Sequence, residues 1–175
     1  MSSRFTIAAV AAFAVASAAV AQPAAKPTDP QIAHIAYTAG VLDIAAAKQA
    51  LAKSKNAQVR AFAEEMVRDH QAVNDKALAL VKKLHVTPQD NPTSQALTAA
   101  ADQKLHDYAA LKGHAFDVAY ATNEVAYHKT VNGALASTLI PDAQNAELKS
   151  LLQTGLSLFQ AHQAHAEHLA MSLAK

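Results

Sequence analysis

The chain of 175 residues contains no cysteine. It therefore forms no disulfide, offers no thiolate metal ligand and has no thiol nucleophile. Glycine is scarce as well, and no Gly-x-Ser-x-Gly, glycine-rich phosphate loop or His-Glu-x-x-His pattern occurs. Nucleophilic catalysis has no support in the sequence, and the stability of the fold must come from packing alone.

An excess of charge of either sign is also lacking. The chain has 15 basic and 14 acidic residues, and the first 21 residues contain Arg4 and no acid, so the remainder is balanced. A neutral chain without a polybasic block has no electrostatic surface for nucleic acid or for anionic lipid. We expect no nucleic-acid partner.

The one long apolar run lies at residues 5–18, after Arg4 and before Ala19-Val20-Ala21. This pattern predicts a secretory signal peptide over residues 1–21, with Gln22 as the first residue of the mature protein. The run is shorter than the ~20 residues that span a bilayer, and no cysteine is available for a lipid anchor. We therefore expect a periplasmic or secreted protein without stable membrane insertion.

Residues 22–30 contain three prolines and are expected to form a flexible lead-in. From residue 31 the chain is rich in Ala, Leu, Lys and Gln, which predicts one all-helical domain over residues 31–175. Apolar stripes place long helices at residues 31–53, 57–84, 114–138 and 143–173. Asp29 and Asp142 are candidate N-caps of the first and fourth helices, and Pro141 is expected to end the third.

The connections between these helices are short, long and short. Pro88 and Pro92 interrupt the long one, and Thr93 or Ser94 can cap a minor helix that reaches residue 111. This order favours a ferritin-like four-helix bundle, in which one long crossover makes helices two and three run parallel. An up-down-up-down bundle with an elaborated loop fits the same pattern.

Three histidines fall on the apolar stripes of the last three long helices: His70, His128 and His162. Each lies roughly 13–18 residues into its helix, or about 20–27 Å, so we expect them at one level of the bundle. At that level the first helix offers Asp43. Imidazole and carboxylate together are ligands for zinc, copper or iron, and the sequence therefore predicts a transition-metal site.

Other carboxylates lie close to this predicted layer. Glu124 precedes His128 by one helical turn, so it can be a further ligand or an acceptor for the ring N–H. Glu65 and Asp69 are candidates for the same outer role. The di-iron signature of two Glu-x-x-His pairs is absent, which leaves oxidase chemistry with little support. The alternative is that the histidines are hydrogen-bonded core residues.

A second group of histidines, His162, His165 and His168, follows a spacing of three along the fourth helix. Steps of three rotate by about −60°, so these side chains spiral around the helix and only adjacent pairs can share an ion. His165 and His168 are thus candidates for a second, weak surface site. The alternative is a solvated helix end.

Several stretches resemble one bacterial family. They are residues 40–44, 59–63, 66–70 and 116–120, together with Leu156 and Phe159 ahead of His162. The chain resembles the domain of unknown function 4142 family, secreted ferritin-like proteins often labelled outer-membrane proteins. The resemblance covers about residues 31–175, and Met-Val-Arg-Asp-His at 66–70 is its most specific part. It implies a ferritin-like bundle in the cell envelope and supplies no established activity.

The chain departs from that family's pattern at three positions. The family usually has glutamate where this chain has Asp43, often aspartate in place of Tyr127, and usually an apolar residue at the position of Glu124. Two function classes remain: a periplasmic metal-binding bundle, and a structural or interaction module of the envelope. A metal-dependent enzyme ranks below both, because no substrate pocket or general base can be argued from the sequence.

Overall fold

A computed structural model describes residues 26–175, and these residues form an all-α structure without β-strands. The signal peptide predicted at residues 1–21 and the first part of the lead-in lie outside the described residues. Five long helices are present: α1 Asp29–Lys53, α2 Ala57–Lys83, α3 Pro92–Ala110, α4 Gly113–Ala134 and α6 Ala146–Leu173. A π-helical turn, η1 Leu135–Leu139, and the short α5 Ile140–Asp142 connect α4 to α6.

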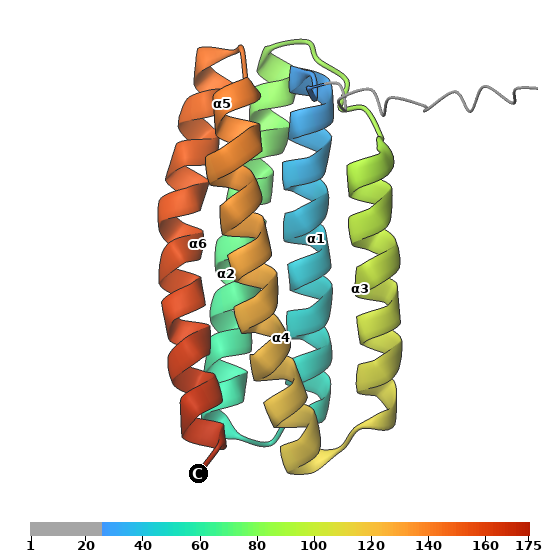
Figure 1. Cartoon of the computed structure of the whole chain (residues 1–175), viewed down its shortest axis with the longest axis vertical. Coiled ribbons are helices and arrows are strands. Elements are labelled where there is room, and N and C mark those ends of the chain that lie inside the picture. Colours follow the sequence, from blue (N-terminus) through green and yellow to red (C-terminus); the bar gives the residue numbers. More distant parts are fainter. Residues whose placement is uncertain (1–25) are drawn as a thin grey trace, which may run out of the picture.

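The long helices lie side by side along one axis (Figure 1). α1 packs against α2, α4 packs against α6, and these two pairs meet through α2 with α6 and α1 with α4. α3 covers the outside of α1 and returns the chain along the length of the molecule, so that α2 and α4 run in the same direction (Figure 1).

The helix starts differ from two of the predicted caps. The N-cap of α1 is Thr28, whose backbone N–H donates to Gln31 Oε1 at 2.9 Å. Asp29 is already inside the helix, and its carboxylate accepts from the backbone N–H groups of Gln144 and Asn145, both at 2.8 Å. Asn145, and not Asp142, is the N-cap of α6. Asp29 therefore joins the start of α1 to the start of α6.

Two further expectations about the connections were wrong. Asn91 caps α3 by accepting from the backbone of Thr93 and Ser94, so neither of those residues is the cap. Pro141 does not end the helix that precedes it, because the helical backbone continues from α4 through η1 and α5 as far as Asp142. α1 begins at Asp29, two residues before the predicted start of the first helix.

The interior has two parts of different character. Toward the α1–α2 turn it is filled by large side chains from α2, α3 and α4: Phe62, Met66, Tyr108, Phe116 and Tyr120. Toward the opposite end it is aliphatic, with Ile32, Ile35, Leu135, Leu148 and Leu152. None of the helices formed by residues 26–175 is long and apolar enough to cross a membrane.

Candidate metal centre

The structure brings the four predicted ligand residues together in the interior. Asp43, His70, His128 and His162 are 14, 13, 15 and 16 residues beyond the first residues of α1, α2, α4 and α6, respectively. At 1.5 Å per residue these depths differ by only about 5 Å, so the four positions meet at one level. All four side chains are buried, with at most 3 % of each residue exposed.

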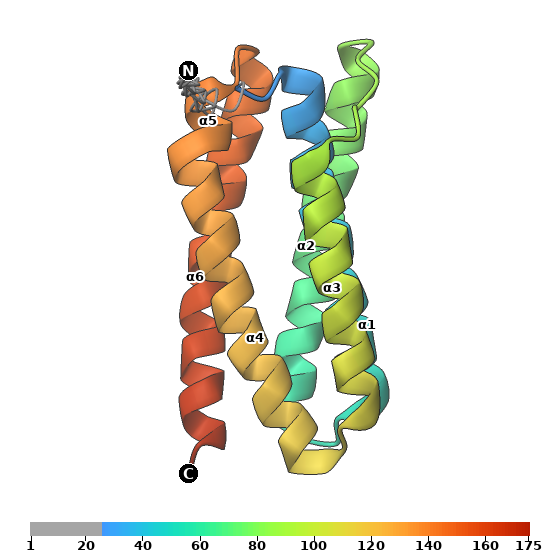
Figure 2. The same ribbon diagram turned by 45° about the vertical axis from the view of Figure 1, so that its right-hand side comes forward.

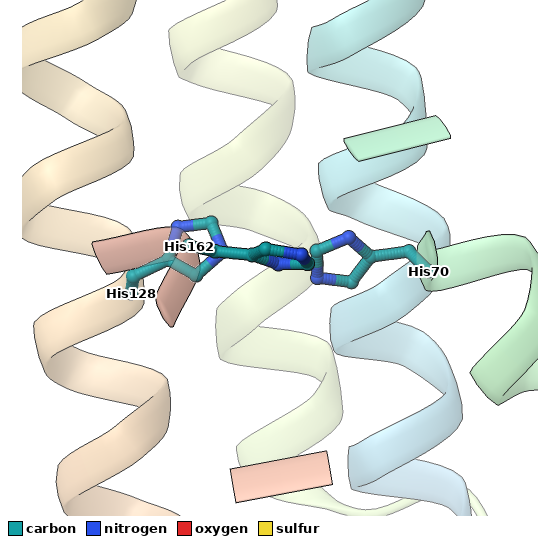
Figure 3. A group of neighbouring side chains, drawn as sticks. All are labelled: His70, His128 and His162. Atoms are coloured by element: carbon teal, nitrogen blue, oxygen red, sulfur yellow. The ribbon is translucent and has the colours of Figure 1, made fainter. Parts of the chain in front are cut away.

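The three imidazole rings extend from α2, α4 and α6 toward one another (Figure 3). Their centroids form a nearly equilateral triangle, with separations of 5.7 Å for His70–His128, 5.2 Å for His70–His162 and 5.5 Å for His128–His162. One nitrogen of each ring lies within 4.8 Å of the nitrogens offered by the other two.

Hydrogen bonds at the outer nitrogens decide which nitrogen of each ring carries the proton. Nδ1 of His70 lies 3.0 Å from the Met66 carbonyl oxygen, and Nδ1 of His128 lies 3.0 Å from that of Glu124. A carbonyl oxygen can only accept, so Nδ1 must be the donor in both rings. In the neutral rings Nε2 therefore keeps its lone pair.

His162 is held by a carboxylate instead. Its Nε2 lies 3.1 Å from Asp69 Oδ2. Although partial burial raises the pKa of Asp69, hydrogen bonds from Arg68 and His162 outweigh it and lower that pKa, which keeps the carboxylate ionised and accepting. The lone pair of His162 is thereby left on Nδ1, which is buried without a hydrogen-bond partner among the described residues. A carboxylate that fixes the tautomer in this way is typical of metal-binding histidines.

The Asp43 carboxylate faces two of these lone pairs. Its Oδ2 lies 3.7 Å from His70 Nε2 and 3.6 Å from His128 Nε2, which is too long for a hydrogen bond. Neither oxygen of Asp43, nor Nε2 of His128, has a hydrogen-bond partner among the described residues. Acceptors thus face acceptors inside the protein, an arrangement that costs free energy unless a cation or protons lie between them.

Burial keeps the histidines neutral. It lowers the pKa of His70 to about 4 and also lowers the pKa of His128 and of His162. Burial raises the pKa of Asp43, and the neighbouring His128 and Glu124 oppose part of this rise. Burial and the neighbouring Asp43 raise the pKa of Glu124 well above its ordinary value. A proton on Glu124 can satisfy one oxygen of Asp43, but it leaves the imidazole lone pairs without a donor.

These separations suit a shared metal ion. An ion about 2.1 Å from a ring nitrogen lies about 3.2 Å from the ring centre, so the centroids of three ligating rings are about 5.2–5.6 Å apart. In a tetrahedral site, ligand atoms at that distance from the ion are about 3.4 Å from one another. The observed separations between the ring centroids match those expected for three rings that share an ion. The 3.6 and 3.7 Å separations between Asp43 and the histidines lie close to the distance expected between ligand atoms in a tetrahedral site.

A partly exposed cluster lies on the outer side of His162. Glu65, Asp69 and His162 place potential ligand atoms within 4.8 Å of one another, and Glu65 Oε2 is 2.6 Å from His165 Nδ1. His165 therefore contacts a residue of α2, whereas His168 is exposed. The structure does not bring His165 and His168 together in a group of three potential ligands within residues 26–175.

Two contacts at this level were not predicted from the sequence. The ring of Phe159 stacks on His70, with centroids 4.7 Å apart and planes within 4°. The hydroxyl of Tyr127 donates to the Ala39 carbonyl at 2.8 Å and ties α4 to α1. Phe159 was identified only as an apolar position one turn before His162, because periodicity gives the face of a side chain but not its partner.

A family model described as "domain of unknown function (DUF4142)" matches residues 14–169. The chain belongs to this family. The match covers Asp43, His70, His128 and His162 and the long helices that carry them, except for the last residues of α6. No curated protein and no solved structure is detectably similar to the chain.

Proposed function

We propose that this DUF4142 protein binds one transition-metal ion through Asp43, His70, His128 and His162. Three neutral imidazoles and one carboxylate suit zinc, copper or iron. The observation that carries the proposal is the arrangement of lone pairs: each histidine has its outer nitrogen engaged. The inner nitrogens of His70 and His128 face Asp43, and the inner nitrogen of His162 is buried without a partner among the described residues.

Glu124 contributes to this proposed site as a nearby acid. Its carboxyl group lies with Asp43 and His128 in a second group of potential ligand atoms within 4.8 Å. An ion bound to Asp43 and His128 favours the ionised form of a neighbouring carboxyl. Glu124 is thus proposed either to complete the coordination or to lose its proton when the ion binds.

The proposed fold class is a ferritin-like four-helix bundle formed by α1, α2, α4 and α6. In its support, α3 acts as the long crossover, and α2 and α4 run in the same direction (Figure 1), as that class requires. The two Glu-x-x-His pairs of di-iron members are absent. We therefore propose metal handling or sensing rather than oxidase chemistry.

The proposed location is the periplasm, reached through a signal peptide at residues 1–21. Support comes from the sequence pattern of an arginine, an apolar run and a small-residue cleavage site. The intact mass of protein secreted by a bacterial host should correspond to a chain that begins at Gln22. A mass that retains the leader would contradict this location.

The test of the metal site is elemental analysis of untagged protein purified without chelator. We expect about one equivalent of zinc, copper or iron per chain, and loss of that metal in His128→Ala, whereas His114→Ala on the exposed start of α4 should retain it. Wild-type protein that carries no such ion and takes up none on dialysis would leave the histidine layer a structural feature. The protein would then be an envelope interaction module.

A further inference from the structure

The interior contains a cavity of about 680 Å³ on the aliphatic side of the histidine layer. It lies between the pair α1–α2 and the pair α4–α6, which spread apart toward the end where α5 lies (Figure 2). Phe159, stacked on His70, forms part of its wall. The cavity reaches the exposed residues Pro92 and Thr93 and therefore opens to solvent.

Small side chains cause this cavity. Alanines at positions 33, 36 and 39 of α1, Ala77 of α2 and Ala134 of α4 line it, as does Gly155 of α6. The other half of the interior has phenylalanine, tyrosine and methionine between the same helices. Protein interiors are normally packed as densely as organic crystals, so a gap of this size is unusual.

A change in helix geometry accompanies the cavity. The π-helical turn η1 follows α4 directly, and three of its five residues line the cavity: Leu135, Thr138 and Leu139. Leu135 and Leu139 are buried. Such turns are rare and occur frequently at functional sites. Here it widens the helix at the wall opposite α2 and adds leucine surface to the cavity.

The shape of the cavity restricts its occupant. Leu148 and Phe159 both line it and are 11 residues apart on α6, which corresponds to a length of about 16 Å. A single hydrocarbon chain of about a dozen carbons fits the length, and each CH₂ group gains from burial.

We propose that this cavity binds one hydrocarbon chain of a lipid-like molecule, such as a fatty acid, with its polar head at the open end. Gln31 and Asn91 lie on the lining at that end, together with Lys26, whose Nζ is 2.7 Å from Asp142 Oδ1. Volumes of 300–1,000 Å³ with mostly apolar walls and a few polar groups are typical of small-molecule sites. This site is separate from the proposed metal site and does not require it.

The test uses the whole mature chain in the presence of chelator, so that its outcome does not depend on metal binding. Dodecanoate and dodecanol are titrated by calorimetry, and the two ligands separate the contribution of the chain from that of a charged head. The blocked variant is Ala77→Phe/Ala134→Phe, which fills the cavity from α2 and α4. The matched control is Ala99→Phe, on the exposed face of α3.

We expect saturable binding of about one ligand per chain, weakened by about tenfold or more in the blocked variant and unchanged in the control. Each single variant is measured as well, and a raised melting temperature without ligand shows that the new ring has entered the cavity and not disrupted the fold. Binding of neither ligand to wild type would overturn the proposal. Equal binding to wild type and to a folded blocked variant would do so too.

Discussion

Zinc should stabilise the wild-type protein against heat, and His70→Ala should remove that effect. His70 is one of the four proposed ligands, and its ring is also fixed by the Met66 carbonyl and by stacking on Phe159. The alanine variant therefore loses both a ligand and some packing. For that reason the zinc-dependent shift, and not the melting temperature itself, is the quantity to compare.

The size of the shift follows from mass action. Free zinc at a hundred times its dissociation constant stabilises the folded state by about 2.7 kcal/mol. In a domain of this size about 1 kcal/mol corresponds to about 2–4 °C, so we expect a rise of roughly 5–11 °C. If the loss of His70 weakens binding about a hundredfold, the same zinc concentration gives about 0.4 kcal/mol. The rise then falls to about 1–2 °C.

The matched control is His106→Ala, an exposed position within α3. The chain has nine histidines, so both variants keep eight and bind zinc equally in the unfolded state, which would otherwise reduce the shift. His85 is a poorer control because its φ of 53° disfavours alanine. Differential scanning fluorimetry with zinc and with chelator gives the zinc-dependent shift of wild type, of His70→Ala and of His106→Ala. A shift in His70→Ala as large as in wild type would refute the ligand role of His70.

Three more outcomes are expected. In chelated protein the free energy of unfolding should be greatest near pH 6.5. Below this pH the histidines of the unfolded chain bind protons, whereas those of the folded protein stay neutral because their pKa values are lowered. Above this pH Glu124 is ionised in the unfolded chain but keeps its proton in the folded protein, where its pKa is raised. Urea denaturation from pH 4.5 to 8 checks this, and a monotonic profile would contradict it. Asp69→Asn should weaken zinc binding about 10–100-fold in calorimetry, whereas Asp75→Asn, exposed on α2, should leave it unchanged. Phe62→Ala, at a fully buried position, should lower the free energy of unfolding measured in urea titrations by about 3–5 kcal/mol. A decrease of less than about 1 kcal/mol would show that the aromatic half of the core does not support the fold.

The helices were predictable because their signals are local. The apolar stripe of α2 and the polar turn after Lys53 placed Ala57–Lys83 within one residue of the structure. The errors fall at caps, where several Asp, Asn, Ser and Thr residues compete over a short distance. Asn145 was preferred to Asp142 because η1 and α5 extend the preceding helix past Pro141. A π-helical turn has no sequence signal that periodicity can detect.

The histidine layer was predictable from depth along the helices, since residues near the middle of similar helices meet whatever their direction. Its hydrogen bonds were not. That Nδ1 of His70 and His128 reaches a carbonyl of the preceding turn depends on the side-chain rotamer. The pairing of His165 with Glu65 depends on the rotation of α6 against α2. The cavity was missed because alanine counts as apolar in a stripe although it fills little space.

The position of the layer between the two halves of the core gives it a physical role beyond ligand supply. On one side aromatic side chains hold the helices together, and on the other small residues leave them apart. A buried layer of acceptors without donors works against closure of the interior at this boundary. An ion bound there would reverse that effect by joining α1, α2, α4 and α6 through one ligand each. Metal binding should therefore stiffen the wall that Phe159 shares between layer and cavity. If zinc slows backbone hydrogen exchange at His128 but leaves the exchange rates of the α6 backbone around Phe159 unchanged, the histidine layer and the cavity are independent of each other.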